Sequence, residues 1–177
     1  MLSFWTLLLA LALLVETGQS QSYKSIPTVL NLAKGRRAYQ SSVYPHKILG
    51  SADKAVDGFY AGNFHQGSCT HTDGEKDPWW LVDLDSEYAI AAVMVKNRDD
   101  CCGERLLGAE VRVGNTIVDH GKSNTLCGII TDVTQGSVSS FNCHWLRGRY
   151  MSIHIPRHGY LTLCEVDVYG AVAEEMH

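Results

Sequence analysis

Residues 80–95, "WLVDLDSEYAIAAVMV", contain the pattern that decides the fold class. Trp80, Val82 and Leu84 occupy alternate positions and therefore share one face of an extended strand. The second half, Tyr88 to Val95, is apolar almost throughout, which is typical of a strand covered on both faces. Neither half has the 3.6-residue spacing of an amphipathic helix. The stretch therefore predicts β-structure.

The same alternation recurs later in the chain. One run places Ala109, Val111 and Val113 on a common face, and another does so with Met151, Ile153 and Ile155. Glycine-containing turns such as 57–58, 62–63 and 136–137 separate the runs at short intervals. A short helical turn is expected only at 52–56. These features predict a single all-β domain built as a sandwich.

The amino terminus has the pattern of a secretory signal peptide. The apolar run Leu2–Val15 is followed by small and polar residues up to Ser20. This run is shorter than the ~18 apolar residues that usually span a bilayer, so an uncleaved anchor is the weaker alternative. We expect a signal peptide over 1–20, a secreted domain over 21–170 and a short tail over 171–177.

The charge balance narrows the range of partners. The chain has 19 acidic and 15 basic residues and a formal net charge of -4, which argues against nucleic acid or an anionic membrane as the main partner. No segment after the signal peptide is apolar enough to insert into a membrane. The overall balance still allows a local basic pocket.

Six cysteines lie in the expected mature chain: Cys69, Cys101, Cys102, Cys127, Cys143 and Cys164. An even number in a secreted protein predicts three disulfides, but spacing does not choose among the fifteen possible pairings. Two of the cysteines are adjacent, and they bond either to distant partners or to each other. A bond between neighbours closes a strained ring, and backbone strain concentrates at functional sites. Zinc is not expected, because no C-x-x-C pair occurs.

The adjacent cysteines lie within "NRDDCCGERLLG", residues 97–108, which has an unusual density of charge. Arg98 and Arg105 present forked N–H donors that suit clustered oxygen atoms. Asp99, Asp100 and Glu104 can neutralise these guanidinium groups, so a neutral polyol such as a sugar is favoured over an anion. The alternative is a salt-bridge network on a solvated loop.

Catalysis is not expected from this segment. A general acid needs a raised pKa, whereas Arg98 and Arg105 would keep the neighbouring carboxylates ionised. No nucleophile, zinc-protease or phosphate-loop motif occurs elsewhere in the chain. We therefore predict a binding protein and not an enzyme.

The chain resembles the F-type lectins, the fucose-binding family that includes the eel fucolectins. The resemblance rests on His71, followed about two dozen residues later by R-x-D-x4-R, here Arg98, Asp100 and Arg105, around the adjacent cysteines. Further similar segments are "KAVDG" (54–58), "HQGSCTHT" (65–72), "PWWLVDL" (78–84), "GRYMSIHIP" (148–156) and "LCEVDVYG" (163–170). The resemblance covers nearly all of the expected mature chain.

This resemblance implies a discoidin-like β-jelly-roll sandwich that holds the sugar in loops at one end. His71, Arg98 and Arg105 would donate hydrogen bonds to fucose, and Asp100 would orient the arginines. A bonded Cys101–Cys102 pair would contact the sugar ring. The 6-methyl group would enter an apolar pocket formed by Phe64 and His65 and bordered by His46.

The resemblance also implies the remaining disulfides, Cys69–Cys164 and Cys127–Cys143, and a structural Ca²⁺. Side-chain oxygens for this ion would come from Asp57, Ser68 and Glu165, and backbone carbonyls from Lys54, Phe59 and Cys164. Such hard oxygen ligands suit calcium.

The function so implied is that of a secreted lectin for terminal L-fucose on cell-surface glycans, used in agglutination or innate immune recognition. It would act as a homo-oligomer, and a trimer is expected. The alternative is a discoidin-like adhesion module for another polar or anionic ligand. His65 would weaken binding in mild acid if its protonation adds charge to the site.

Overall fold

The computed structural model describes residues 29–172, so the predicted signal peptide (1–20) and most of the predicted tail lie outside the described residues. The strands are β1 (Leu30–Asn31), β2 (Arg37–Gln40), β3 (Glu75–Lys76), β4 (Trp79–Lys96), β5 (Glu110–Gly114), β6 (Thr125–Ile129), β7 (Val138–His154), β8 (His158–Gly159) and β9 (Glu165–Val172). The helical turns are η1 (Ala52–Ala55), η2 (Phe64–Gln66), η3 (Gly103–Leu106) and η4 (Val118–Gly121). Within 29–172, no helix is long and apolar enough to cross a membrane.

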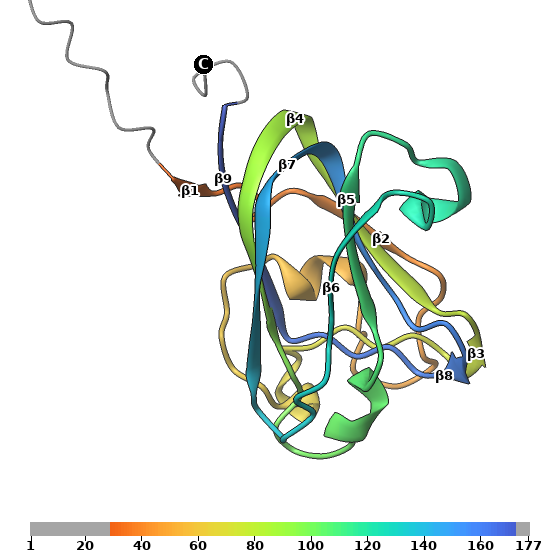
Figure 1. Cartoon of the computed structure of the whole chain (residues 1–177). Helices are drawn as coiled ribbons and strands as arrows, with labels where there is room; N and C mark the ends of the chain where they lie inside the picture. Colours follow the sequence, from red (N-terminus) through yellow and green to blue (C-terminus); the bar gives the residue numbers. More distant parts are fainter. Residues whose placement is uncertain (1–28, 173–177) are drawn as a thin grey trace, which may run out of the picture.

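Two long strands, β4 and β7, organise the all-β sandwich (Figure 1). The first part of β4 pairs with β2 on one side and with β7 on the other, from Trp79 to Asp83. After a break in register, the part from Tyr88 to Lys96 pairs with β9 and again with β7. Asp85 lies at this break with a left-handed backbone, φ 68°. Strands β4 and β7 therefore pair with each other both in the part of the sheet that contains β2 and in the part that contains β9, as expected for the predicted sandwich.

The core is formed by the faces that the alternation predicted. Each predicted run is buried: Trp80, Val82 and Leu84 in β4; Ala109, Val111 and Val113 in or beside β5; Met151, Ile153 and Ile155 in or beside β7. The continuous apolar run of β4 is buried at Ala89, Ile90, Val93 and Val95. The sequence pattern thus predicted the core-facing residues correctly.

The predicted helical turn at 52–56 forms as η1 and closes one side of this core. Ala55 and Val56 are buried there, and the indole nitrogen of Trp80 donates to the carbonyl of Ala52 over 2.9 Å. A buried indole N–H needs such a partner. This bond fixes the loop that leads towards η2.

The sheet extends further towards the carboxyl terminus than predicted. Ala171 and Val172 were assigned to the tail, but they pair with Ala89 and Tyr88 as the last residues of β9. Ala171 is also buried, because its small side chain lies within the paired strands. The predicted tail therefore begins two residues too early.

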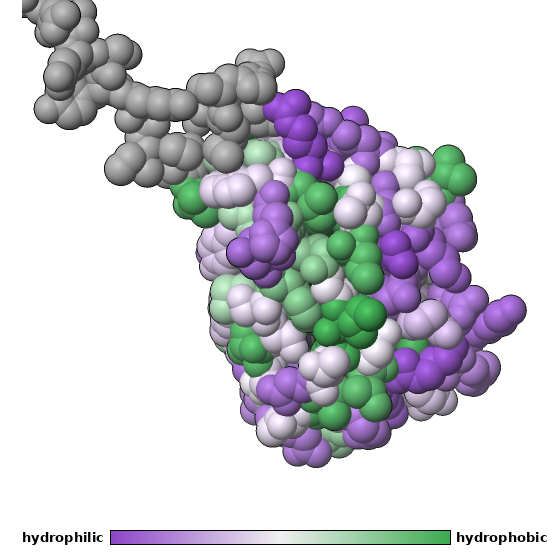
Figure 2. Space-filling model, viewed as in Figure 1, coloured by the Kyte–Doolittle hydropathy of each residue, from purple (hydrophilic) through white to green (hydrophobic). Residues whose placement is uncertain are grey.

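Three disulfides connect the elements in the predicted pairing: Cys69–Cys164, Cys127–Cys143 and Cys101–Cys102. The first joins the loop after η2 to the residue before β9, and the second joins β6 to β7. Apolar side chains along β6 remain partly exposed between polar neighbours, as the green residues along the middle of Figure 2 show. The third disulfide lies in the loop between β4 and η3, where the candidate site is found.

Candidate functional site

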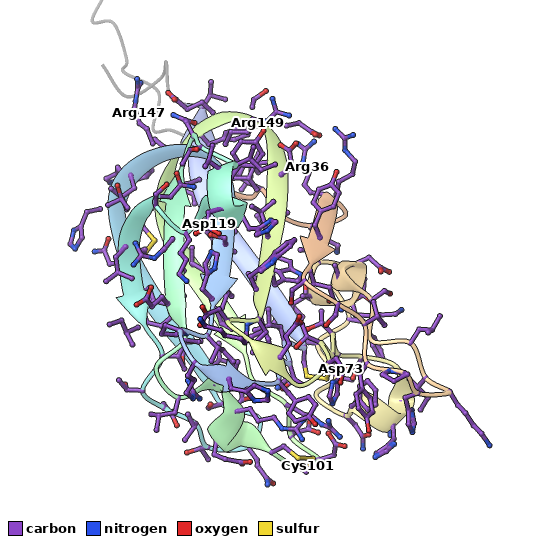
Figure 3. The ribbon with its side chains drawn as sticks, turned by 90° about the vertical axis from the view of Figure 1, so that its right-hand side faces the viewer. Arg36, Asp73, Cys101, Asp119, Arg147 and Arg149 are labelled. Atoms are coloured by element: carbon purple, nitrogen blue, oxygen red, sulfur yellow. A yellow bond between two sulfur atoms is a disulfide. The ribbon has the colours of Figure 1, made fainter. Side chains whose placement is uncertain are left out.

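A pocket of about 260 Å³ opens among the loops at one end of the sandwich. It is lined by Tyr44, His46, Phe64, His65, His71, Arg98, Cys101, Cys102, Arg105 and Tyr160. Figure 3 shows Cys101 at this lower end. Eight of the nine predicted sugar-site residues line the pocket, and the ninth, Asp100, is bonded to Arg98 directly behind it. The sequence motif therefore converges on a single site.

Arg98 is held by a two-pronged bond to Asp100. Its Nε and Nη2 atoms donate to Oδ1 and Oδ2 of Asp100, each over 2.6 Å. These bonds hold the pKa of Asp100 down at about 2, and the backbone N–H of Phe64 adds to the effect. Arg98 is only 4% exposed, so its guanidinium is rigid and already oriented. Its remaining terminal nitrogen, Nη1, is not bonded to Asp100.

Arg105 has a different environment. Its guanidinium lies 4.6 Å above the ring of Tyr160 and 3.1 Å from Nε2 of His71. None of the ion pairs among residues 29–172 involves Arg105, so the expectation that Asp100 orients both arginines holds only for Arg98. Burial and the charge of Arg98 lower the pKa of Arg105. The pocket therefore retains one positive charge without a carboxylate partner, and it is less neutral than the charge pattern predicted.

The imidazole of His71 is fixed in one tautomer by two neighbours. Its Nδ1 lies 2.7 Å from the carbonyl oxygen of Thr72, which can only accept, so Nδ1 carries the proton. Its Nε2 faces the guanidinium of Arg105, which can only donate. Burial, followed by the charges of Arg105 and Arg98, lowers the pKa of His71 below 6.5 despite the opposing Thr72 bond. The neutral ring thus has its acceptor at Nε2, whereas the family resemblance implied that His71 donates.

The bonded Cys101–Cys102 pair forms one wall of the pocket. Cys102 precedes η3 with a left-handed backbone, φ 64°, which is strained for a residue other than glycine. The turn that follows holds Arg105, while Leu106 is buried in the core. The strained pair therefore joins the core-anchored turn η3 to the ligand-facing surface.

Aromatic rings complete the opposite wall. Phe64 is 2% exposed, and its ring lies 5.6 Å from His46, 5.7 Å from His65 and 5.0 Å from His71. The guanidinium of Arg98 stacks on the same ring at 4.8 Å. His65 is exposed, with Nε2 3.8 Å from Asp100 Oδ2. The three predicted aromatic residues do form one apolar corner.

Two tyrosines of the pocket were not predicted. The ring of Tyr44 stacks on His71 at 4.5 Å, and Tyr160 lies edge-on to His71 at 5.7 Å. They come from the loop after β2 and from the segment after β8. The only sequence signal was the position of Tyr44 two residues before His46, because contact with His71 arises through the tertiary fold.

The predicted calcium ligands lie beside the Cys69–Cys164 disulfide. Glu165 is 1% exposed, its Oε1 accepts from the N–H of Gly58 over 3.2 Å, and its Oε2 has no hydrogen-bond partner within 29–172. Burial raises the pKa of Glu165 to about 7, and the charge of Asp57 adds to the shift. A buried carboxylate oxygen without a partner, close to a second carboxylate, fits a cation that prefers oxygen ligands.

The other proposed ligands show one departure. Ser68 is buried and donates to the carbonyl of Asn63 over 2.7 Å, so its oxygen keeps free acceptor capacity. The ammonium of Lys54 lies 3.7 Å from Oδ2 of Asp57 and therefore points towards the proposed site. Asp57 Oδ1 accepts from the N–H of Phe59. The donor set fits calcium, with Lys54 as a competitor for Asp57.

Comparison with known proteins adds independent observations. A family model described as NedA-like, galactose-binding domain matches residues 54–153. Fucolectin-4 of Anguilla japonica is 43% identical over 141 residues, 78% of this chain and 78% of the relative. The Pentraxin fusion protein of Xenopus laevis is 40% identical over 156 residues, 88% of this chain and 37% of the relative.

Among solved structures, an f-lectin (fucolectin) from the serum of Morone saxatilis (striped bass) matches with a TM-score of 0.77 and 44% identity. The match covers 82% of this chain and 49% of the bass chain. This chain therefore spans less than half of the bass lectin and of the Xenopus protein, but most of the eel relative.

Proposed function

This chain belongs to the fucolectin family of NedA-like, galactose-binding domains, and we propose that it is a lectin whose loop pocket binds terminal L-fucose. The observation that carries the proposal is the convergence of Arg98, Arg105 and His71 with the bonded Cys101–Cys102 pair in one pocket. A polar ligand with several hydroxyl groups uses donors and acceptors of this kind. An apolar ligand would leave them unpaired.

Three side chains supply the polar contacts. Arg98 and Arg105 donate to oxygen atoms of the sugar. When Arg105 turns Nη1 from Nε2 of His71 to the sugar, the single lone pair of Nε2 becomes free to accept from a hydroxyl group. A hydroxyl group can donate to the histidine and accept from an arginine at the same time. The bond to Asp100 fixes Arg98 before the ligand arrives, which reduces the entropy lost on binding.

Apolar contacts orient the sugar ring. The Cys101–Cys102 pair packs against its carbon face, and the 6-methyl group enters the corner formed by Phe64, His65 and His46. Methyl burial contributes about 0.8 kcal/mol for a group of this size. A sugar with a hydroxyl group on C6 would have to desolvate it in the same corner, so the corner favours L-fucose over its 6-hydroxylated counterpart, L-galactose.

A glycan array with free fucose as competitor, repeated on Arg105→Ala, tests this proposal. Loss of one forked donor is expected to cost about 1–3 kcal/mol, because the sugar oxygens that it served lose their partner. Arg37→Ala is a matched control, since Arg37 is exposed and lies in β2 away from the pocket. Glycan binding that is reduced neither by free fucose nor by Arg105→Ala would contradict the proposal.

We also propose a structural Ca²⁺ held by Asp57, Ser68 and Glu165, with carbonyls of Lys54, Phe59 and Cys164. The partnerless Oε2 of buried Glu165 supports it. The ion would supply positive charge to a carboxylate that the described residues leave unpaired. Through the neighbouring Cys164 and its disulfide to Cys69, it would also stiffen the loop that carries η2.

The proposed biological setting is extracellular. The three disulfides suit secretion of the mature chain, and recognition of fucosylated cell-surface glycans suits agglutination or innate immune recognition. A single sugar site binds weakly, so the lectin would work as a homo-oligomer, with a trimer expected, through avidity. No turnover is expected, so calorimetry with a simple fucoside should give heat that ends at saturation.

One observation favours a second candidate function. Because Arg105 lacks a carboxylate partner, an anionic ligand could supply one, as in an adhesion module that shares this scaffold. Competition separates the two candidates. Fucose displaces the glycan if the sugar pocket is correct, whereas a sulfated glycan that lacks fucose does so if the anionic reading is correct.

A further inference from the structure

The two arginines of the pocket are held in different ways. Arg98 donates from Nε and Nη2 to Asp100, so two of its nitrogens are used within the protein. Arg105 lies instead over the ring of Tyr160, with Cζ 4.6 Å from the ring centroid. A ring face attracts the whole cation, whereas a carboxylate oxygen occupies particular N–H groups. The stack on Tyr160 therefore leaves more donors of Arg105 for a ligand.

Backbone pairing fixes the position of Tyr160. The residues before it, in β8, pair with β3. After it, the N–H of Leu161 donates to Oγ1 of Thr72 over 2.8 Å, and the N–H of Thr72 donates to the carbonyl of Leu161 over 3.0 Å. Leu161 is also buried. The segment that carries Tyr160 is thus joined to the segment that carries His71, and both rings belong to one rigid unit.

A glycine outside the pocket makes room for the ring of Tyr160. A Cβ atom added to Gly74 would lie 2.8 Å from Cζ and 2.9 Å from Oη of Tyr160, so the ring would have to shift. Gly74 itself does not line the pocket. A Cβ atom added to Gly159, directly before Tyr160, would meet no atom within 4 Å. The ring therefore depends on the missing side chain at Gly74 in particular.

Arg105 reaches this ring from a different element, η3, which Leu106 anchors in the core. The backbone of Arg105 is held as well, because its carbonyl accepts from Nη2 of Arg157 over 3.0 Å. The segment 157–160 therefore contacts both the backbone and the guanidinium of Arg105. With these contacts, Nη1 of Arg105 lies 3.1 Å from Nε2 of His71.

We propose that Tyr160 positions Arg105 for the sugar while leaving its N–H donors free. The ring face thus replaces the carboxylate that Asp100 provides for Arg98. Because a cation is attracted within about 6 Å of the ring centroid, Arg105 can turn Nη1 from His71 to a sugar oxygen without leaving the ring. Two parallel bonds to a carboxylate would oppose that movement. This role rests on the proposed fucose site and adds a residue that acts through Arg105.

The stack can be measured without any sugar. In a proton–nitrogen correlation spectrum, with Arg105 assigned from the signal lost in Arg105→Lys, its Nε–H proton should be shifted upfield by the ring current of Tyr160. Tyr160→Leu should remove this shift, and Tyr160→Phe should keep it. An Arg105 signal that Tyr160→Leu leaves unchanged would overturn the proposal.

Fucose calorimetry measures the consequence for binding. Tyr160→Leu should weaken fucose binding about tenfold, whereas Tyr160→Phe should stay within about twofold, because a phenyl ring keeps the face that holds the cation. Tyr150→Leu is the matched control, since Arg149 stacks on Tyr150 at 5.2 Å. Figure 3 shows Arg149 far from Cys101, which marks the pocket end. This control should leave the affinity for fucose unchanged.

A double substitution separates positioning from direct contact with the sugar, because Tyr160 also lines the pocket. If Tyr160 acts through Arg105, Tyr160→Leu should cause no further loss of fucose affinity in an Arg105→Ala background. Titration of the methyl signal of fucose in proton spectra measures these weak affinities. A further loss of about tenfold would show direct contact and overturn the positioning role.

Gly74→Ala provides a second test that keeps the side chain of Tyr160. The added methyl group should displace the ring and weaken fucose binding a few fold, although Gly74 does not line the pocket. Gly159→Ala is the matched control and should bind fucose as the wild type does. Equal affinities in these two variants would contradict the role of the ring position.

These measurements separate the positioning role from the proposed function. If the wild type binds no fucose but the Arg105 signal depends on Tyr160, the proposed function fails and Tyr160 still positions Arg105. If the wild type binds fucose and Tyr160→Leu binds it equally well, the positioning role fails and the proposed function stands.

Discussion

Asp100 and Glu165 are both shielded carboxylates, but the two regions that contain them treat charge in opposite ways. Asp100, behind the sugar pocket, accepts two bonds from Arg98, and its pKa is held at about 2. Glu165, beside the Cys69–Cys164 disulfide, has one oxygen without a partner, and burial raises its pKa to about 7. Asp100 is therefore paired within the chain, whereas Glu165 has no ion-pair partner within residues 29–172, and we propose that Ca²⁺ supplies its counter-charge.

The largest effect is expected where the internal counter-charge is removed. Arg98→Ala leaves the carboxylate of Asp100 shielded and unpaired, which should lower the free energy of unfolding by about 3 kcal/mol. Fucose binding should disappear as well, because Arg98 faces the pocket. Urea unfolding and fucose calorimetry measure the two losses.

The exposed ion pair of Arg36 and Asp85 provides the control for this change. Its side chains are 35% and 43% exposed, so Arg36→Ala should cost less than about 1 kcal/mol. Equal losses in the two variants would show that the shielding of Asp100 has no energetic consequence.

The second largest effect is expected on removal of the external counter-charge. Chelation should lower the melting temperature, and adding Ca²⁺ back should restore it; an ion at a hundredfold excess over its dissociation constant contributes ~2.7 kcal/mol. Glu165→Gln should abolish this response, because the neutral amide lacks the charge that the ion would balance. Calorimetric scans with and without chelator measure the effect.

Asp167→Asn serves as a control for this response. Asp167 is another buried carboxylate of β9, but its Oδ1 accepts from Asn31, so it already has a partner. This variant should keep the full response to Ca²⁺. If chelator leaves the melting temperature of the wild-type protein unchanged, the proposed Ca²⁺ site is contradicted.

A smaller effect is expected from the proton on His71. Because burial and the nearby arginines lower its pKa below 6.5, His71 should remain neutral and accept a sugar hydroxyl down through mild acid. At lower pH the protonated ring can no longer accept, and its charge opposes Arg105. Fucose affinity should therefore be flat above pH 6.5 and fall, by about tenfold, only below it.

His65→Asn separates the two histidines in this measurement. The exposed imidazole of His65 lies 3.8 Å from Oδ2 of Asp100 and lines the same pocket, so it is the second histidine to test. If the fall in affinity persists unchanged in His65→Asn, His71 is responsible. If it vanishes, His65 causes the fall, and the predicted effect of protonating His71 is contradicted.

Much of this organisation could be predicted from local sequence. Alternation in residues 80–95 predicted the buried face, whereas the meeting of His71, Arg98 and Arg105 was implied by the family resemblance. The disulfide pairing followed from family resemblance, since spacing alone allowed fifteen solutions.

The rest depends on contacts between distant segments. The tautomer of His71 is set by Thr72 and by Arg105, and no motif records which ring nitrogen faces the arginine. The stacking of Tyr44 on His71 likewise arises only when the loop after β2 folds back. The left-handed backbone at Asp119 could not be predicted, because the residue at that position is not glycine.

The smallest effect should come from Lys54, a cation that lies beside one of the proposed calcium ligands. Its ammonium is 3.7 Å from Oδ2 of Asp57, and both side chains are about one-third exposed. Lys54→Met should tighten Ca²⁺ binding a few fold, because an exposed pair of this kind is worth less than about 1 kcal/mol and competes with the ion. Lys122→Met is the matched control, since Lys122 forms a similarly exposed pair with Asp77 at 3.5 Å, away from the proposed ligands. Calcium titration calorimetry measures the sign of this change. Weaker Ca²⁺ binding in Lys54→Met would mean that Lys54 supports Asp57 as a ligand. The calcium region would then contain a useful positive charge of its own, and it would differ less from the region of Asp100 than the comparison with Glu165 implies.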